Sequence, residues 1–206
     1  GTMPIGGSKT VSCEVWTEFN GLTSGTVSDT HTVAVVADGV KVSGKVVSYN
    51  PKNSVTVQLK QGDTEMYTAT VTTPTAASGQ AEQSFSISTV APGTYDLVVT
   101  KDAHLTYTVK NVKVEGTDLD LTKLTDKPYS TITLLAGDVN EDGKINSTDT
   151  TFIRYPSNFN KSVTSPGVDA IADINGDGKI NSTDTTIVRY PENFNKNAGT
   201  HCTVQY

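Results

Sequence analysis

Acidic and amide side chains recur at a fixed spacing in two short stretches of the chain. Residues 137–149 read GDVNEDGKINSTD, and residues 172–184 read ADINGDGKINSTD. In both stretches an aspartate, an asparagine and an aspartate occupy alternate positions, and a glycine follows. Ca²⁺ prefers roughly six to eight oxygen ligands at about 2.3–2.6 Å, and carboxylate and amide groups supply such oxygens. The spacing therefore predicts one calcium loop in each stretch and two calcium ions in all.

Each predicted loop closes into a ring of twelve residues. Side chains at positions 1, 3, 5, 9 and 12 and the main-chain carbonyl at position 7 supply oxygens, while the glycine at position 6 permits the sharp turn. The predicted ligands of the first loop are Asp138, Asn140, Asp142, Lys144, Asn146 and Asp149. Those of the second loop are Asp173, Asn175, Asp177, Lys179, Asn181 and Asp184.

The charge of each ring also favours a bound cation. Three carboxylates in one small space repel each other by several kcal/mol at an intermediate dielectric. The alternative is an ordinary Asp/Asn/Gly surface turn, which a second copy with the same spacing makes less favourable. The two NST sequences match a glycosylation pattern, but a glycan on Asn146 or Asn181 would lie inside the metal ring.

A short helix is predicted after each loop. The segments STDTTFIRYP and STDTTIVRYP have one apolar face, with Ser147 and Ser182 expected to cap the helices. Pro156 and Pro191 are expected to end them after about nine residues. No helix of usable length precedes Gly137, which argues against a calmodulin-type sensor, whose loops lie between two helices.

The residues before the repeats have the pattern of a β-sandwich. Strands are predicted at 31–39, 41–50, 54–62, 66–73, 84–89, 94–102 and 105–116, most of them bounded by Gly, Pro, Asn or Asp. Val55, Val57 and Leu59 alternate with polar residues, so that strand has one buried face. The fold class is therefore a mainly β sandwich, immunoglobulin-like or transthyretin-like, followed by a small α-helical module of two loop–helix repeats.

Two D-x-N-x-D-G-x-x-N-S-T-D loops, each leading into one helix, resemble a dockerin module. This resemblance covers residues 137–196 and implies two calcium-binding loop–helix units related by a near two-fold axis. It also implies docking onto a cohesin module of a cellulosome-type complex. In dockerins, positions 10 and 11 of the repeat and later helix positions face the cohesin. Here these residues are Ser147, Thr148, Arg154, Tyr155, Ser182, Thr183, Arg189 and Tyr190.

The β-rich block is similar to the X modules that often precede dockerins and to the carboxypeptidase-regulatory sandwich, on its strand spacing and its PGTYDL turn. The expected organisation is an expression tag and N-terminal segment at 1–30, an X module at 31–136 and a dockerin with a C-terminal tail at 137–206. Nineteen of twenty-five repeat positions are identical. Either helix could therefore meet the cohesin, or one face could dominate.

Composition excludes several classes of function. The net charge is −6 without a long basic run, which argues against nucleic-acid binding. No stretch is apolar for long enough to cross a bilayer. The histidines His31, His104 and His201 are scattered without a motif around them, so neither an enzyme nor a small-molecule substrate is expected. The resemblance implies a secreted protein in a complex at the cell surface.

Two further points concern stability and function. Cys13 and Cys202 are either bridged by a disulfide, which an export setting permits, or two free thiols. About sixty residues with few large apolar groups make a thin core, so metal binding is expected to stabilise the repeats. The alternative function is a calcium-stabilised adhesion or structural module without a cohesin partner.

Overall fold

The computed structural model describes residues 8–15, 18–23, 27–34 and 39–206, with side chains from residue 39 onward. The chain divides into two compact units, Gly1–Gly39 and Val40–Tyr206. In the first unit β1 (Ser8–Val15) pairs antiparallel with β4 (Val27–Ala34), and β2 (Glu18–Phe19) pairs with β3 (Leu22–Thr23). The second unit carries both the sandwich and the repeats.

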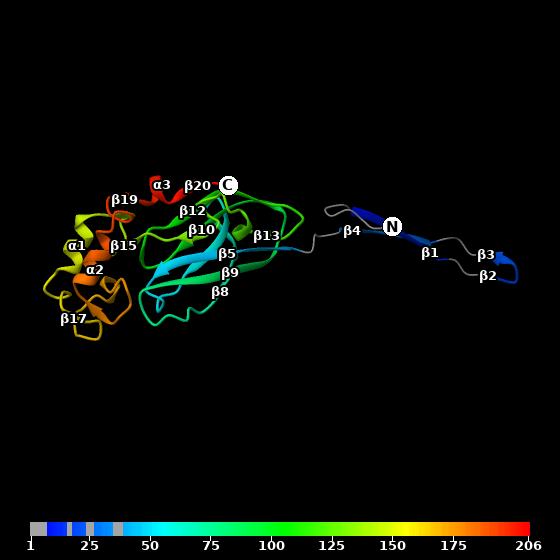
Figure 1. The fold of residues 1–206 in the computed structure, drawn as a ribbon. Coiled ribbons are helices and arrows are strands. Elements are labelled where there is room, and N and C mark those ends of the chain that lie inside the picture. The colour runs from blue at the N-terminus through cyan, green and yellow to red at the C-terminus, as the bar shows by residue number, and fades with distance from the viewer. Residues whose placement is uncertain (1–7, 16–17, 24–26, 35–38) are drawn as a thin grey trace. The chain divides into compact units, whose positions relative to one another are not determined.

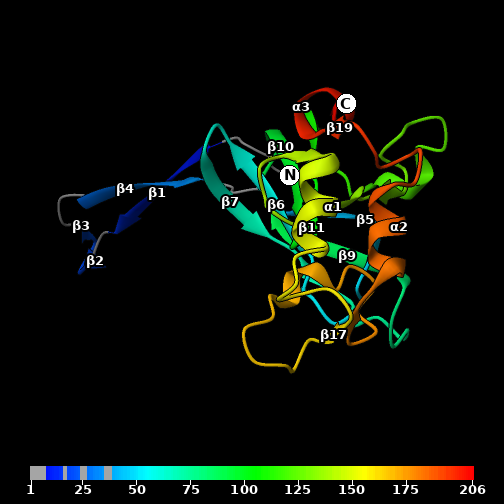
Figure 2. The same cartoon turned by 90° about the vertical axis from the view of Figure 1, so that its left-hand side faces the viewer.

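Two sheets form the sandwich, as Figures 1 and 2 show. The first has the order β20-β12-β10-β6-β7 and the second the order β13-β5-β9-β8, with β14 also paired to β5. The strands of the first sheet are β6 (Thr56–Gln61), β7 (Thr64–Thr68), β10 (Gly93–Thr100), β12 (Tyr107–Val114) and β20 (Thr203–Gln205). The strands of the second are β5 (Val40–Tyr49), β8 (Thr70–Val71), β9 (Gln80–Val90), β13 (Leu119–Asp120) and β14 (Ile132–Thr133). The predicted fold class is confirmed.

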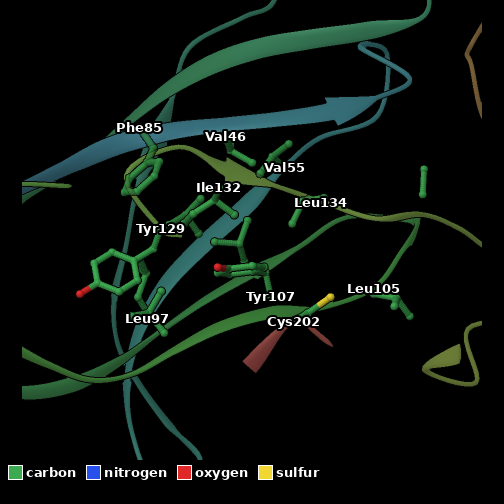
Figure 3. Packing of buried hydrophobic residues seen from close by; sticks show 14 of the residues in the cluster. Val46, Val55, Phe85, Leu97, Leu105, Tyr107, Tyr129, Ile132, Leu134 and Cys202 are labelled. Carbon is green, nitrogen blue, oxygen red and sulfur yellow. The ribbon is translucent and has the colours of Figure 1, made fainter. Parts of the chain in front are cut away.

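Alternating apolar residues explain why the two sheets face each other. On β6 of the first sheet Val57 and Leu59 are fully buried, and on β5 of the second sheet Val42 and Val46 are too. Strands place every second side chain on one face, so the two sheets bury these residues between them. Figure 3 shows Leu97, Phe85 and Tyr129 among the side chains of this core.

Two of the predicted sandwich strands differ from the structure. Of the segment 31–39, residues 31–34 belong to β4, which pairs with β1 in the first unit, and residues 35–38 lie outside the described residues. The segment 66–73 forms two strands, because β7 ends at Thr68 and β8 begins at Thr70 in the opposite sheet. At the crossing, the Ala69 N–H donates to the Val57 carbonyl at 2.8 Å. The chain thus passes from one sheet to the other at Ala69. The alternation of apolar residues in this segment is compatible with either sheet and so does not predict the crossing.

The repeats contain two short helices, α1 (Ser147–Ile153) and α2 (Ser182–Val188), and η2 (Ala170–Ala172) precedes the second loop. α1 and α2 lie side by side at one end of the sandwich (Figures 1 and 2). β16 (Lys144–Ile145) pairs with β19 (Lys196–Asn197), and β17 (Lys161–Ser162) pairs with β18 (Lys179–Ile180). The residues that follow each helix therefore hold the loop of the other repeat.

The helices are shorter than predicted. Each has seven residues instead of about nine, with Arg154 and Arg189 as C-terminal caps. The residue before a proline disfavours helical backbone, so Tyr155 and Tyr190, which precede Pro156 and Pro191, lie beyond the last helical turn.

Several segments join the repeats to the sandwich. β11 (Ala103–His104) pairs with β15 (Ala136–Asp138), and β20 at the C-terminus pairs in parallel with β12. Along the chain, η1 (Leu121–Lys123) lies between β11 and β15, and α3 (Ala198–His201) precedes β20. Apolar residues of the repeats, such as Ile145, Ile153 and Ile187, belong to one core cluster with those of the sandwich. The second unit is therefore stabilised as a whole.

Removing residues 204–206 tests the contribution of β20. The truncation removes the bond from the Tyr206 N–H to the Lys110 carbonyl (3.0 Å) and the stacking of Tyr206 on Tyr129 (ring centroids 5.7 Å). We expect the free energy of unfolding to fall by about 2–4 kcal/mol, measured by urea denaturation. Gln205→Ala, which loses one exposed side-chain bond to Asn111, is the control and should cost less than about 1 kcal/mol. An unchanged midpoint after truncation would contradict this prediction.

Candidate metal centres and partner face

Main-chain N–H groups fix the first loop around its aspartates. The Asp138 carboxylate accepts from the N–H groups of Asp142 and Gly143, both at 3.0 Å. The Asp149 carboxylate accepts from Val139 (3.1 Å) and Asn146 (2.8 Å). One carboxylate thus holds the turn, and the other holds the start of the loop against the start of the helix.

The second loop repeats these bonds. Asp173 accepts from the N–H groups of Asp177 (3.2 Å) and Gly178 (2.9 Å). Asp184 accepts from Ile174 and Asn181, both at 2.9 Å. The same sequence spacing therefore produces the same local geometry twice. Gly143 and Gly178 have φ of 79° and 92°, a left-handed backbone that glycine adopts at little cost.

The helix caps differ from the prediction. Asn146 and Asn181, not Ser147 and Ser182, are the N-cap residues. The Asn146 amide oxygen accepts from the Thr148 N–H at 2.8 Å, and Asn181 accepts from Thr183 at the same distance. Both asparagine and serine are good caps, and the choice falls one residue earlier because the carboxylate of Asp149 or Asp184 also binds the cap's own N–H in a capping box.

Burial and mutual repulsion make these carboxylates hard to ionise without a cation. Burial, with a smaller contribution from the charges of Asp149 and Asp142, raises the pKa of Asp138 to about 6. Burial, followed by the charge of Asp173, raises the pKa of Asp184 to about 6. Main-chain hydrogen bonds oppose both shifts but do not cancel them. A divalent ion would stabilise the charged carboxylates and so oppose these shifts.

The other charges in the described residues fit this interpretation. The ion pairs there join Lys45 to Glu82, Lys110 to Asp96 and Lys123 to Asp120, and none involves a loop aspartate. Buried carboxylates are normally paired or metal-bound. Within the described part of the chain, no three carboxylate, imidazole or thiol groups are grouped closely enough to hold a metal by themselves. A complete ring therefore depends on the amide oxygens of Asn140 and Asn175 and on main-chain carbonyls as well.

Sequence reasoning missed the residues that contact the second loop from the sandwich. The Asn50 side-chain amide donates to the Asp173 carbonyl at 2.9 Å, and the Gly79 N–H donates to the Asn175 carbonyl at 2.6 Å. Asn50 lies 123 residues before Asp173. The available signal was the replacement of Glu141 in the first repeat by Gly176 in the second.

The predicted partner residues fall into two groups. The first group is exposed and has three residues in each repeat, namely Ser147, Thr148, Arg154, Ser182, Thr183 and Arg189. The two tyrosines differ, because Tyr155 is 52% exposed whereas Tyr190 is partly buried against the core. The charges of Tyr190 and Glu192 also contribute, after burial, to the raised pKa of Tyr49 on β5, which places both residues near the sandwich.

Comparisons with known proteins agree with this architecture. Residues 130–190 match the dockerin type I domain, and residues 37–126 match the second beta sandwich domain of NOMO1-like BOS complex subunits. No curated protein matches the chain. Two similar solved structures are type II cohesin–X-dockerin complexes from Acetivibrio cellulolyticus, an N-terminal and a C-terminal interface mutant. Their identities are 28% and 26%, their TM-scores are 0.58 and 0.56, and each match covers 78% of this chain and 98% of the other.

The chain is an X module followed by a dockerin. Dockerins bind calcium in general, and X modules and dockerins are non-catalytic docking modules. The structure of His104 suits a non-catalytic role, because its ring binds the Tyr49 N–H at 3.1 Å and the Asp102 carbonyl at 2.7 Å. In the described residues no helix is long and apolar enough to span a membrane.

The cysteines belong to different parts of the chain. Cys202 lies buried directly before β20, and Figure 3 shows it beside Tyr107 of the X module. Burial raises the pKa of this thiol to about 11. The side chain of Cys13 lies outside the described residues, so the disulfide between Cys13 and Cys202 stays a prediction.

The raised pKa values predict that two quantities change in opposite directions as pH falls, namely the melting temperature in EDTA and the increase in melting temperature caused by calcium. In EDTA the folded dockerin holds protons on Asp138 and Asp184 up to about pH 6, whereas the unfolded chain releases them near pH 4. Melting temperature in EDTA should therefore rise as pH falls from 7.5 to 5. Calcium competes with these protons, so the increase in melting temperature caused by calcium should shrink over the same interval.

Differential scanning calorimetry in EDTA and in excess calcium measures both trends. The control is Asp138→Asn combined with Asp184→Asn, which removes two of the four loop aspartates whose pKa is raised and should weaken the trend in EDTA. A calcium-dependent increase that stays constant between pH 5 and 7.5 would contradict the prediction.

Proposed function

We propose that this chain is a calcium-dependent docking module that binds a cohesin. The dockerin binds two calcium ions and presents its partner face, and the X module stabilises and spaces it. In this role the chain incorporates or anchors its parent protein in a cellulosome-type complex outside the cell.

The main support is the similarity to cohesin-bound X-dockerins over nearly their whole length. Each match includes 98% of the compared chain and therefore both modules together. The calcium part of the proposal is supported by the two equivalent loops, whose buried aspartates have no basic partner among the described residues. The proposed ligands are the twelve residues predicted from the loop spacing.

The partner part of the proposal is supported by the exposed polar residues that follow each loop. Ser147 and Thr148 stand in the first turn of α1, and Arg154 caps its end with its guanidinium 5.8 Å from the Phe159 ring centroid. Hydroxyl, guanidinium and phenol groups on short capped helices suit a polar protein interface with an aromatic anchor. The proposed partner face comprises Ser147, Thr148, Arg154, Tyr155, Ser182, Thr183, Arg189 and Tyr190.

Binding of the chain to a panel of type I and type II cohesins, in calcium and in EDTA, tests the proposal. We expect at least one type II cohesin to bind in calcium and to dissociate in EDTA, because loop and helix share the same aspartates. The control is Asp138→Ala combined with Asp173→Ala, which removes the first ligand of both loops and should abolish binding in calcium. Calcium-stabilised folding without binding to any cohesin would instead support an adhesion or structural role.

The unequal exposure of the tyrosines predicts unequal roles in binding. Tyr155→Ala should weaken cohesin binding by about ten- to a hundredfold, because an exposed aromatic next to arginine is typical of an interface anchor. Tyr190→Ala should change affinity by less than about threefold and lower the melting temperature instead, since Tyr190 packs against the core. Isothermal titration calorimetry and thermal denaturation measure the two effects. Equal losses of affinity would show that both repeats anchor the partner.

A further inference from the structure

The two calcium loops have nearly the same sequence but different surroundings. Asn175 and Gly176 are buried in the second loop, whereas the matching Asn140 and Glu141 of the first loop are exposed. Next to Glu141 and Gly143, a polar groove of about 250 Å³ separates the first loop from Thr100 and Lys101 of the X module. The second loop packs directly on the X module at the corresponding positions.

Asn50 makes this contact through its side chain. Its Nδ2 donates to the buried Asp173 carbonyl at 2.9 Å, and its Oδ1 accepts from the Lys52 N–H at 3.2 Å. The residue is 7% exposed and has φ of 55°, in the left-handed region that asparagine tolerates better than most residues. The Asn50 N–H binds the Gly79 carbonyl at 3.0 Å, and Gly79 in turn donates to Asn175. Asn50 and Gly79 thus hold two carbonyls of the second loop in place.

Gly176 is the residue of the second loop that permits this approach. A Cβ added there would collide with Asn50 Oδ1 and lie 2.8 Å from Asn50 Cγ and 3.2 Å from Asn50 Cα. The matching residue of the first repeat is Glu141, which has a side chain and could not occupy this place. The single Glu-to-Gly difference therefore decides which repeat rests on Asn50.

We propose that Asn50 is a positioning residue for the second calcium site and that the X module makes this site tighter than the first. The proposal rests on the proposed calcium binding of both loops. Ordering a loop costs conformational entropy, and the folded X module has already fixed the Asp173 and Asn175 backbone before an ion arrives. The first loop is attached to the X module through its start, where Asp138 in β15 pairs with Ala103, but its next residues Asn140 and Glu141 are exposed to solvent.

Coupling of this kind is reciprocal. If the folded X module raises the calcium affinity of the second loop, calcium in that loop stabilises the X module by the same factor. The first loop lacks the Asn50 contact, so its occupancy should affect the X module less.

Single-site variants separate the two loops. Asp138→Ala removes a ligand of the first site, so that only the second site remains. Asp173→Ala removes a ligand of the second site, so that only the first site remains. Asn50→Gly is placed in each background because glycine keeps the left-handed backbone and removes only the side chain. Calcium affinity is then measured by calorimetric titration of the full chain with calcium alone.

We expect Asn50→Gly to weaken the second site by about tenfold, the effect of one buried hydrogen bond, and to change the first site by less than about twofold. General destabilisation of the fold would weaken both sites alike and would overturn the proposal, as would the absence of any effect. If the single-site proteins bind no calcium at all, the proposed function fails instead, so the two failures are distinguishable.

Gly176→Ala tests the contact from its other side, and its comparison with Glu141→Ala in the first loop does not require Asn50→Gly to fold. It should weaken the second site by at least tenfold in the normal background and by clearly less with Asn50→Gly, which removes the Oδ1 and Cγ atoms that the new Cβ would meet. Glu141→Ala is the matched control in the first loop, where it should leave calcium affinity within about twofold. Equal effects of Gly176→Ala with and without Asn50 would overturn the proposal.

Discussion

The dockerin depends on the neutralisation of a few buried carboxylates. Asp149 and Asp184 are fully buried, and each binds the N–H at the start of its loop and the N–H of its helix cap. One charged group thus closes the loop and starts the helix. Because burial disfavours the charge, a bound cation would stabilise the same carboxylates that hold the partner face in place. Calcium dependence of docking would then be a direct consequence of local structure.

The packing of the dockerin explains why an X module accompanies it. Each repeat buries a few isoleucines and valines, and these belong to the same core cluster as Leu97, Leu105 and Tyr129 of the sandwich. Main-chain pairing crosses between the modules at β11–β15 and again at β12–β20. A module of this size gains stability from a neighbour as well as from metal. The sequence changes near Ala136 from strand-like segments to the repeats, but the core continues across this boundary without a break.

Much of the site follows from the sequence because the relevant interactions are local. The loop spacing and the glycine turn join residues within twelve positions of each other, and the structure has the tight turns that the pattern indicates. The cap was misplaced by one residue because asparagine and serine have similar propensities. The division of segment 66–73 between two sheets and the contact of Asn50 with Asp173 depend on tertiary packing. Alternation and propensity do not specify which distant segment a strand or turn will meet.

Near-identity of two repeats does not make them equivalent in the folded chain. The dockerin repeats share their loop bonds, but only the second loop contacts Asn50 of the X module, and the contrast between Glu141 and Gly176 lies at that contact. The tyrosines after the helices differ for the same reason, since Tyr190 is partly buried near the sandwich and Tyr155 is open to solvent. If the proposed coupling holds, a dockerin of two near-identical repeats joined to one neighbour has a calcium site coupled to that neighbour and a separate face with an exposed aromatic residue. The X module would in this way influence both metal binding and the residues that are exposed to a partner.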